Sequence, residues 1–410
     1  MYMNFLLYLV YEVLIWLLIL LFFIFLVFKF RNKIKILRKN SKTVVITGFG
    51  FFLVLIISFF YFNPGGNLLE MPMYSHSHAP GGKTASVPLL NAIAFFLNST
   101  KFDKVADIGA DPNNVPAFVS KTDAAVRIDI TAQEVISEIR NGSYFNYWTY
   151  NKQVPGPMYR VKLGDTVIVS LTNHKSSIHH HNIDMHAVTG PGGGAAVTHV
   201  APGETKSFKW KALNPGIYVY HCAMPNVSTH NSHGQYGLIL VEPPEGLSRV
   251  DKEFYIMQGE LYTLGGLGKK GLTIFNTQGL IDGNPTYVTF NGKVETTPRM
   301  KAKVGDKIRM FVGNGGLNLI SSFHVIGEIF DVVYPEGAIG SPPLRNIQTT
   351  AVLPGGATIV EFTVDVPGNY LLVDHALARM NKGAWAVLEV EGNDNPDVFQ
   401  SLDPDSDMHH

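Results

Sequence analysis

Tyr218-Val219-Tyr220-His221-Cys222-Ala223-Met224-Pro225 is the one stretch of the chain that contains a cysteine. Successive side chains of a β-strand point to opposite faces, so we expect His221 and Cys222 to serve two different sites. With no second cysteine in the chain, Cys222 cannot form an internal disulfide. The peptide between these two residues would then be a short covalent path between two sites, which indicates redox chemistry.

Histidines flank this stretch on both sides. His181 and His186 precede it in His181-Asn182-Ile183-Asp184-Met185-His186, and His230 and Gln235 follow it. One thiolate and two imidazoles are the ligands of a blue copper site, whose weak axial position takes Met, Gln or a backbone oxygen. Cys222 alone would indicate only a small buried residue. The whole set of residues predicts a metal site.

Composition limits the class of protein. The chain has 410 residues, of which 46% are hydrophobic and 16% charged, enough for two or three domains with packed cores. Its 33 basic and 33 acidic residues give a formal net charge of zero. Bulk charge therefore gives no reason to expect binding to nucleic acid.

Two apolar runs, residues 5–30 and 43–62, predict a transmembrane helical hairpin over residues 1–62. The loop between them contains six basic residues and no acidic one, so the positive-inside rule places it in the cytoplasm. We therefore expect a two-helix protein of the cytoplasmic membrane with its remaining domains on the periplasmic or extracytoplasmic side. Residues 1–4 lack positive charge and residues 63–66 lack a small-residue cleavage site, which favours a retained anchor over a cleaved signal peptide.

Beyond residue 100, short alternating runs punctuated by Gly and Pro predict strands of a sandwich or barrel. A series of landmarks then occurs twice in the same order. The first copy is Gly164-Asp165, Asn173, Pro202-Gly203, Pro215-Gly216, Tyr218 and His221, and the second is Gly305-Asp306, Asn314, Pro354-Gly355, Pro367-Gly368, Tyr370 and His375. We interpret this as a tandem duplication of one Greek-key β-sandwich.

The expected organisation has five parts. They are the hairpin (1–62), a linker with a short helix (63–102), a first β domain (103–246), a second β domain (247–395) and a tail (396–410). Only the first β domain contains a cysteine, so only that domain can hold the thiolate site.

The chain resembles the copper-containing nitrite reductases, trimers with two cupredoxin domains per subunit, and most of all their neisserial outer-membrane branch. The stretches that carry the resemblance are 181–186, 220–223, Ser322-Phe323-His324-Val325-Ile326-Gly327 and Val373-Asp374-His375-Ala376. The resemblance implies reduction of nitrite to nitric oxide in denitrification, with a type 1 and a type 2 copper in each subunit.

The resemblance also implies residue roles. His181, Cys222 and His230 would bind the type 1 copper, and His186, His221 and a neighbouring subunit's copy of His375 the type 2 copper. Asp184 would donate a proton and His324 would assist it. Ile326 would cap the type 2 copper, and Thr350 would lie near the hydrogen-bond partner of His324. His179, His180, His199 and His233 match no family role, and we expect them in loops or at the surface.

Two features depart from the family pattern. Gln235 stands where relatives carry the axial Met, and a harder oxygen ligand should lower the type 1 potential. The hairpin is the second departure, since most relatives are soluble or lipid-tethered. It would hold the trimer beside an electron donor such as a cupredoxin or a cytochrome c. Direct quinol oxidation is a weaker hypothesis based on Glu12 alone.

Two other functions would also use a thiolate copper site. A two-domain multicopper oxidase carries His-Cys-His for its trinuclear cluster, whereas Ala223 follows Cys222 here. A membrane-anchored cupredoxin carrier without catalysis would hold one copper per chain, and metal analysis with EPR would distinguish it.

Overall fold

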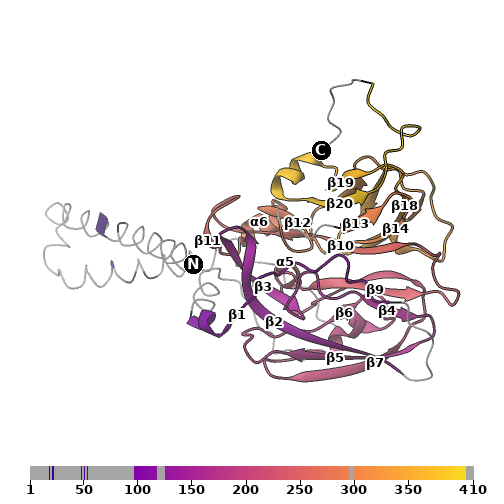
Figure 1. The fold of residues 1–410 in the computed structure, drawn as a ribbon. Coiled ribbons are helices and arrows are strands. Elements are labelled where there is room, and N and C mark those ends of the chain that lie inside the picture. Colours follow the sequence, from indigo (N-terminus) through magenta and orange to yellow (C-terminus); the bar gives the residue numbers. More distant parts are fainter. Residues whose placement is uncertain are drawn as a thin grey trace, which may run out of the picture.

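The computed structural model describes residues 97–117, 125–294 and 300–402, with single residues at Leu18, Leu21, Phe22, Gly48, Gly50 and Leu53 (Figure 1). The predicted hairpin with Glu12, most of the linker and residues 403–410 lie outside these ranges. Within them, no helix is long and apolar enough to cross a membrane.

Strands make up most of the described chain. They are β1 (Asp103–Lys104), β2 (Val126–Arg140), β3 (Ser143–Tyr150), β4 (Tyr159–Lys162), β5 (Thr166–Asn173), β6 (Asp184–Met185), β7 (Thr205–Lys211), β8 (Gly216–His221), β9 (Tyr236–Glu242), β10 (Lys252–Leu261), β11 (Gly271–Leu272), β12 (Tyr287–Phe290), β13 (Met300–Lys303), β14 (Lys307–Asn314), β15 (Ser321–Val325), β16 (Val332–Tyr334), β17 (Thr349–Val352), β18 (Ala357–Thr363), β19 (Gly368–Asp374) and β20 (Trp385–Glu391). The named helices are short: 3-10 helices η2 (Ser99–Lys101), η3 (Pro191–Val197), η4 (Pro335–Gly337) and η5 (Leu377–Lys382), and α-helices α5 (Val227–Ser232) and α6 (Thr277–Ile281). The prediction of an all-β fold is confirmed.

The same order of strand pairing occurs twice along the chain. One sheet contains the run β3-β2-β5-β7 and another the run β12-β10-β14-β18; β2 pairs with β5, and β10 with β14, in parallel. A further sheet is ordered β4-β9-β8-β6, and its counterpart contains the run β13-β20-β19-β15. The parallel pairing of β4 with β9 recurs as that of β13 with β20. The repeated landmarks of the sequence thus correspond to repeated sheet topology.

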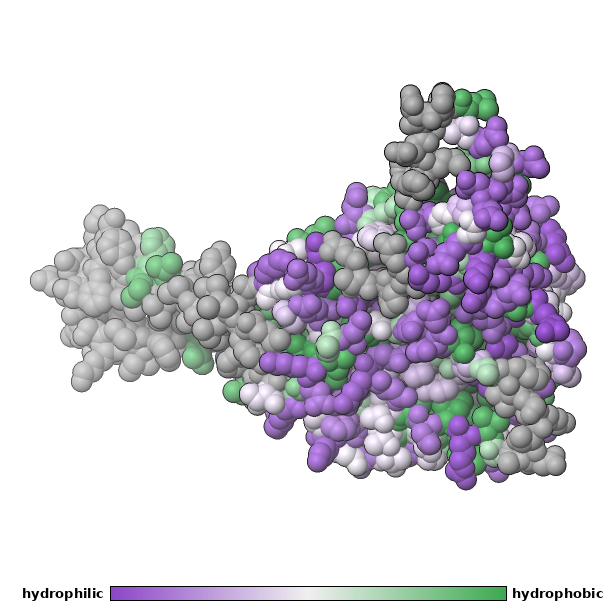
Figure 2. Space-filling model, viewed as in Figure 1, coloured by the Kyte–Doolittle hydropathy of each residue, from purple (hydrophilic) through white to green (hydrophobic). Residues whose placement is uncertain are grey.

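Apolar side chains fill the space between the sheets. They also fill the contact between a first set of strands, β1–β9, and a second set, β10–β20, and the two sets lie one above the other in Figure 1. One core cluster contains Tyr147 and Leu238 from the first set together with Tyr255, Phe311 and Ile359 from the second. Burying each such side chain contributes roughly 1.5–3 kcal/mol. By contrast, polar side chains cover much of the outer surface in view (Figure 2).

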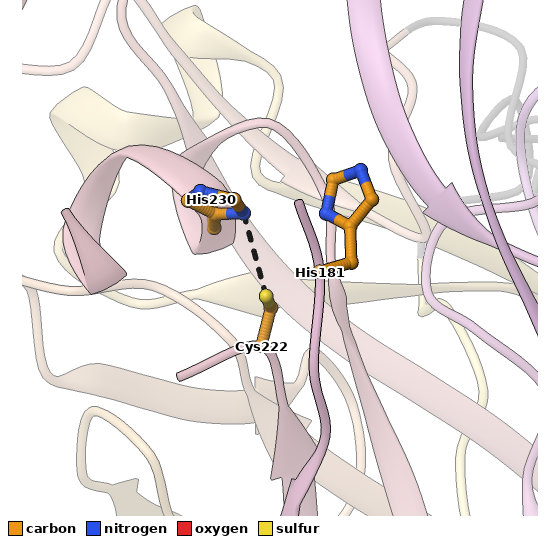
Figure 3. Close-up of side chains that lie close together, drawn as sticks. All are labelled: His181, Cys222 and His230. Carbon is orange, nitrogen blue, oxygen red and sulfur yellow. Dashed lines mark hydrogen bonds between the residues drawn. The ribbon is translucent and has the colours of Figure 1, made fainter. Parts of the chain in front are cut away.

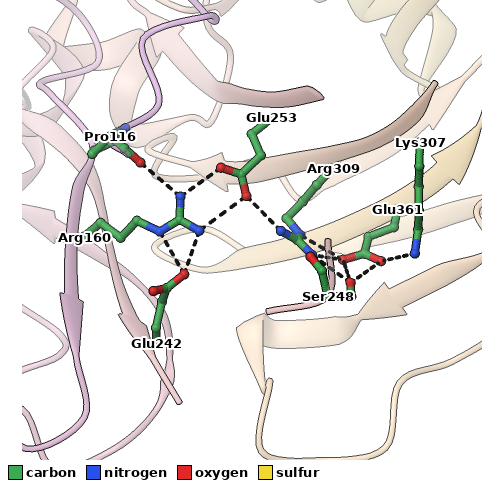
Figure 4. Close-up of polar contacts among 8 residues, drawn as sticks. All are labelled: Pro116, Arg160, Glu242, Ser248, Glu253, Lys307, Arg309 and Glu361. Atoms are coloured by element: carbon green, nitrogen blue, oxygen red, sulfur yellow. Dashed lines mark hydrogen bonds and ion pairs between the residues drawn. The ribbon is translucent and has the colours of Figure 1, made fainter. Parts of the chain in front are cut away.

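A buried ionic network also joins the two sets of strands (Figure 4). Arg160 on β4 lies 2.6 Å from Glu242 on β9 and 2.8 Å from Glu253 on β10. Arg309 on β14 lies 2.8 Å from the other oxygen of Glu253 and 2.6 Å from Glu361 on β18. Glu253 therefore bridges an arginine of each set, and removal of Arg160 would leave the Glu242 carboxylate buried without a partner.

We predict that Arg160→Met destabilises the protein by about 3–5 kcal/mol, because it leaves the Glu242 carboxylate, 1% exposed, without its cation. Urea unfolding measures the change. Lys301→Met is the matched control, since Lys301 pairs with Glu389 at the surface and is 63% exposed; it should change the free energy of unfolding by less than about 1 kcal/mol. Equal effects of the two substitutions would contradict the prediction.

Candidate metal centres

The end of β8 directs two adjacent side chains to different places. β8 ends at His221, and Cys222 is the next residue. On one side, His221 meets His186 and Asp184, and on the other Cys222 meets His181 and His230. The short strand β6 holds the first group together, because it pairs antiparallel with β8 and sets Asp184 opposite His221. The structure thus places the side chains of His221 and Cys222 in two separate clusters.

The first cluster consists of His181, Cys222 and His230, which are all buried. Their ligand atoms lie within 4.8 Å of one another, with Cys222 Sγ 3.3 Å from His230 Nδ1. Figure 3 shows the two imidazole rings on either side of the cysteine sulfur. His181 comes from a loop that forms an isolated β-bridge with Val200, and His230 from α5.

Gln235 lies beside this cluster and is fully buried. Its Oε1 is 3.2 Å from His230 Nδ1, and its backbone carbonyl accepts a hydrogen bond from the Cys222 N–H at 3.1 Å. Among the described residues, its Nε2 has no hydrogen-bond partner. Gln235 is thus close enough to contribute an oxygen to whatever the cluster binds.

The chemistry of the first cluster fits a copper ion. Burial lowers the pKa values of His181 and His230, so both imidazoles are neutral bases. Both ring nitrogens of His181 lack a hydrogen-bond partner within the described chain. Burial also raises the pKa of Cys222 to about 11. A thiolate there needs a cation beside it, and a soft thiolate with two imidazoles is the donor set of blue copper.

The second cluster consists of Asp184, His186 and His221. The Nε2 atoms of its two histidines are 3.0 Å apart, and Nδ1 of His221 is 3.0 Å from the Cys222 carbonyl oxygen. Burial lowers the pKa of each histidine, which leaves neutral rings able to bind a metal. Burial raises the pKa of Asp184, although His186 opposes this shift. A carboxyl group that keeps its proton to a higher pH than an ordinary aspartate, and that lies beside two imidazoles, is suited to acid catalysis.

The remaining predicted site residues lie elsewhere in the chain. His324 and Ile326 are on or just after β15, His375 directly follows β19, and the His324 and His375 rings are 5.3 Å apart. In the described part of one chain, His375 does not join the cluster of His186 and His221. His324 Nδ1 lies 2.6 Å from the Gln348 carbonyl oxygen, whereas Thr350 is opposite Phe323 in the sheet.

The four histidines without a family role lie in loops or turns, as expected, although His233 is not at the surface. This residue is buried, its Nδ1 is 2.7 Å from the Thr229 carbonyl oxygen, and its ring stacks on Trp148. His180 is exposed and His199 partly buried, and their rings meet with Nδ1 of the first 2.7 Å from Nε2 of the second.

Sequence reasoning also missed the glycine loop beside Asp184. Gly193 lies in η3 with φ of +56°, a left-handed conformation that favours glycine. A Cβ at Gly193 would lie 1.9 Å from Asp184 Oδ1. The backbone of η3 therefore packs directly on the carboxyl group of the second cluster. The run of glycines at 192–194 was the signal that could have indicated this close approach.

A repeated two-sheet β fold with a buried cysteine and two histidines defines a copper protein of the cupredoxin class. A family model described as multicopper oxidase matches residues 131–246. The copper-containing nitrite reductase of Neisseria meningitidis serogroup A is 52% identical over 292 residues, which cover 70% of this chain and 75% of that relative. The one from Neisseria gonorrhoeae is 51% identical, covering 70% and 74%.

A solved structure agrees with these relatives. The copper nitrite reductase from Nitrosomonas europaea matches with a TM-score of 0.60 and 31% identity, covering 67% of this chain and 96% of that one. The chain belongs to the copper-containing nitrite reductases. The resemblance inferred from the sequence is confirmed, and with it copper of types 1 and 2 as the cofactors.

We predict that Gly193→Ala lowers the free energy of unfolding by roughly 1–3 kcal/mol, because the new methyl group would overlap the Asp184 carboxyl at an unfavourable φ. Urea denaturation measures the loss. Gly340→Ala is the control, since a Cβ there meets no atom within 4 Å. A Gly193→Ala protein as stable as the wild type would show that η3 does not pack on Asp184.

Proposed function

We infer that the chain is a nitric-oxide-forming nitrite reductase, which reduces nitrite with one electron and two protons to nitric oxide and water. Family membership supports this activity. The observation that carries it is the pair His221 and Cys222, whose side chains belong to two separate clusters although the residues are adjacent. One cluster would accept the electron and the other would deliver it to nitrite.

We propose that His181, Cys222 and His230 would hold the type 1 copper, with the Gln235 side-chain oxygen as a weaker fourth ligand. His186, His221 and a neighbouring subunit's copy of His375 would hold the type 2 copper. Bound copper would supply electron transfer at the first site and an open Lewis-acidic position for nitrite at the second. Their common link is the backbone from His221 to Cys222.

Asp184 and His324 would manage the protons. Because burial raises the pKa of Asp184, its carboxyl group can carry a proton to bound nitrite. The His324 Nδ1–H would donate to the Gln348 carbonyl, which fixes the ring and leaves Nε2 available for proton exchange. Ile326 is 42% exposed in the single chain and could cap a nitrite site formed against another subunit. The role of Thr350 near the hydrogen-bond partner of His324 stays a prediction.

We propose a homotrimer because the residues required at the type 2 site lie in two places on one chain. Exposed apolar side chains flank the strands that carry His324 and precede His375, and exposed apolar groups of this kind favour an interaction surface. They are Ile320, Ile326, Leu353 and Leu377, which are between 42% and 52% exposed. A neighbouring copy that covers this surface would bring the two halves of the type 2 site together.

The wider organisation is proposed on the sequence patterns. Two tandem cupredoxin domains, 103–246 and 247–395, would follow a membrane hairpin at 1–62 that keeps the enzyme on the periplasmic side of the cytoplasmic membrane. The electron donor would be a cupredoxin, a cytochrome c or a quinol, and the pathway denitrification. The repeated sheet order supports the two domains.

The rival functions fit the described residues less well. A multicopper oxidase needs ligands for a trinuclear cluster, yet the described chain contains two groups of three candidate ligands and Ala223 follows Cys222. An electron carrier would need only the first group.

We predict that Asp184→Asn lowers nitrite turnover about 100-fold or more, because the amide cannot donate the proton. Nitric oxide is measured anaerobically with copper-loaded protein and a chemical reductant. In the wild type, turnover should fall as pH rises through the raised pKa of Asp184, since the protonated form is the donor. Asp129→Asn, at an exposed position of β2, is the control. Undiminished turnover by Asp184→Asn would contradict the role.

We predict that Gln235→Met raises the type 1 reduction potential and alters the visible spectrum, because a thioether favours Cu(I) more than an amide oxygen does. Spectroelectrochemical titration measures both properties. Gln278→Met, on the exposed side of α6, is the control. An unchanged spectrum and potential would show that Gln235 is not a ligand.

A further inference from the structure

Glu134 is a buried carboxylate beside the first cluster. It lies on β2, and its side chain is 0% exposed. Its Oε1 accepts hydrogen bonds from the backbone N–H groups of Ile178 and His179, each at 2.8 Å. These two residues begin the segment that leads to His181. Glu134 therefore ties the loop carrying one proposed copper ligand to the middle of a long strand.

The same oxygen faces two imidazoles. It lies 3.1 Å from His179 Nδ1 and 3.7 Å from His181 Nε2. The two backbone N–H donors on Oε1 and the His179 ring beside it stabilise the ionised form of the carboxyl group, so Glu134 places a negative charge in the buried surroundings of the cluster.

The Glu134 carboxyl group and the outer nitrogen of His181 lie close together without a hydrogen bond, since the nearest oxygen, Oε1, is 3.7 Å from His181 Nε2. Within the described residues, Glu134 Oε2 has no hydrogen-bond partner, and neither has Nε2 of His181. In Figure 3 one ring nitrogen of His181 faces the space shared with Cys222 and His230, and the other points away. A carboxylate on the outer nitrogen of a metal-bound histidine fixes the tautomer and makes the ligand more basic.

Glu134 is also linked to His230, the other imidazole of the cluster, through a series of aromatic contacts. His179 lies against Trp148 with ring centroids 4.2 Å apart, and His233 stacks on Trp148 at 4.3 Å. The edge of this indole contacts His230, with centroids 4.6 Å apart. Holding His179 therefore helps to hold Trp148 against the other proposed ligand.

We propose that Glu134 is a positioning residue of the type 1 copper site, which orients His181 by a carboxylate–imidazole contact and lowers the copper's reduction potential by its buried negative charge. The proposal rests on the ligand assignment of the proposed function. Glu134 would then help to set the type 1 reduction potential from β2, a strand far in sequence from every proposed ligand.

The test replaces Glu134 with glutamine in the full, copper-loaded chain, since Gln keeps an oxygen for the two backbone donors and removes the charge. We expect a higher type 1 potential in a redox titration of the blue absorption band. We also expect a 10- to 100-fold loss of type 1 copper affinity against a chelator. Glu138→Gln makes the same charge change on the same strand at a solvated site and should alter neither property.

Unchanged potential and copper affinity in Glu134→Gln would overturn the proposal. Should that variant not fold, Glu134→Asp keeps the charge but withdraws it from His181, and should still weaken copper retention; wild-type retention would overturn the proposal as well. A wild-type protein that shows no blue band when loaded with copper would instead refute the ligand assignment, so the two failures are distinguishable.

Discussion

The alternation of side chains along an extended backbone is the constraint on which the rest of the structure depends. His221 and Cys222 are neighbours in the chain, and the strand geometry at the end of β8 turns them toward different clusters. If either side chain turned to the face of the other, its own cluster would lose a member. The sheets on either side hold this segment in register, since β8 pairs with β6 and with β9.

Burial gives the two clusters opposite properties. In the first cluster the thiol, the imidazoles and Gln235 are enclosed, so a cation is needed to stabilise the thiolate, and rigid neighbours hold the donors in place. In the second cluster Asp184 is partly buried and His186 exposed, so a small anion from solvent can approach the histidine with a source of protons beside it. Electron transfer requires the first environment and nitrite chemistry the second.

The sequence predicted the residues whose chemistry is recognisable by type and spacing. His181, Cys222 and His230 come together as predicted, and so do Asp184, His186 and His221, because these residue types at this spacing are recognisable as metal ligands and an acid. The all-β fold and its repeated order followed from the Gly and Pro landmarks. Glu134, Trp148 and His233 could not be placed, because their roles arise from sheet pairing and stacking between distant segments.

Copper content with EPR, in the wild type and in Cys222→Ala, tests the central claim most directly. The account predicts two coppers per chain in the wild type, one with a type 1 and one with a type 2 spectrum. It predicts that Cys222→Ala loses the type 1 signal and retains the type 2 signal, because His221 belongs to a separate cluster. One copper per wild-type chain, or the loss of both signals from a folded Cys222→Ala protein, would contradict it.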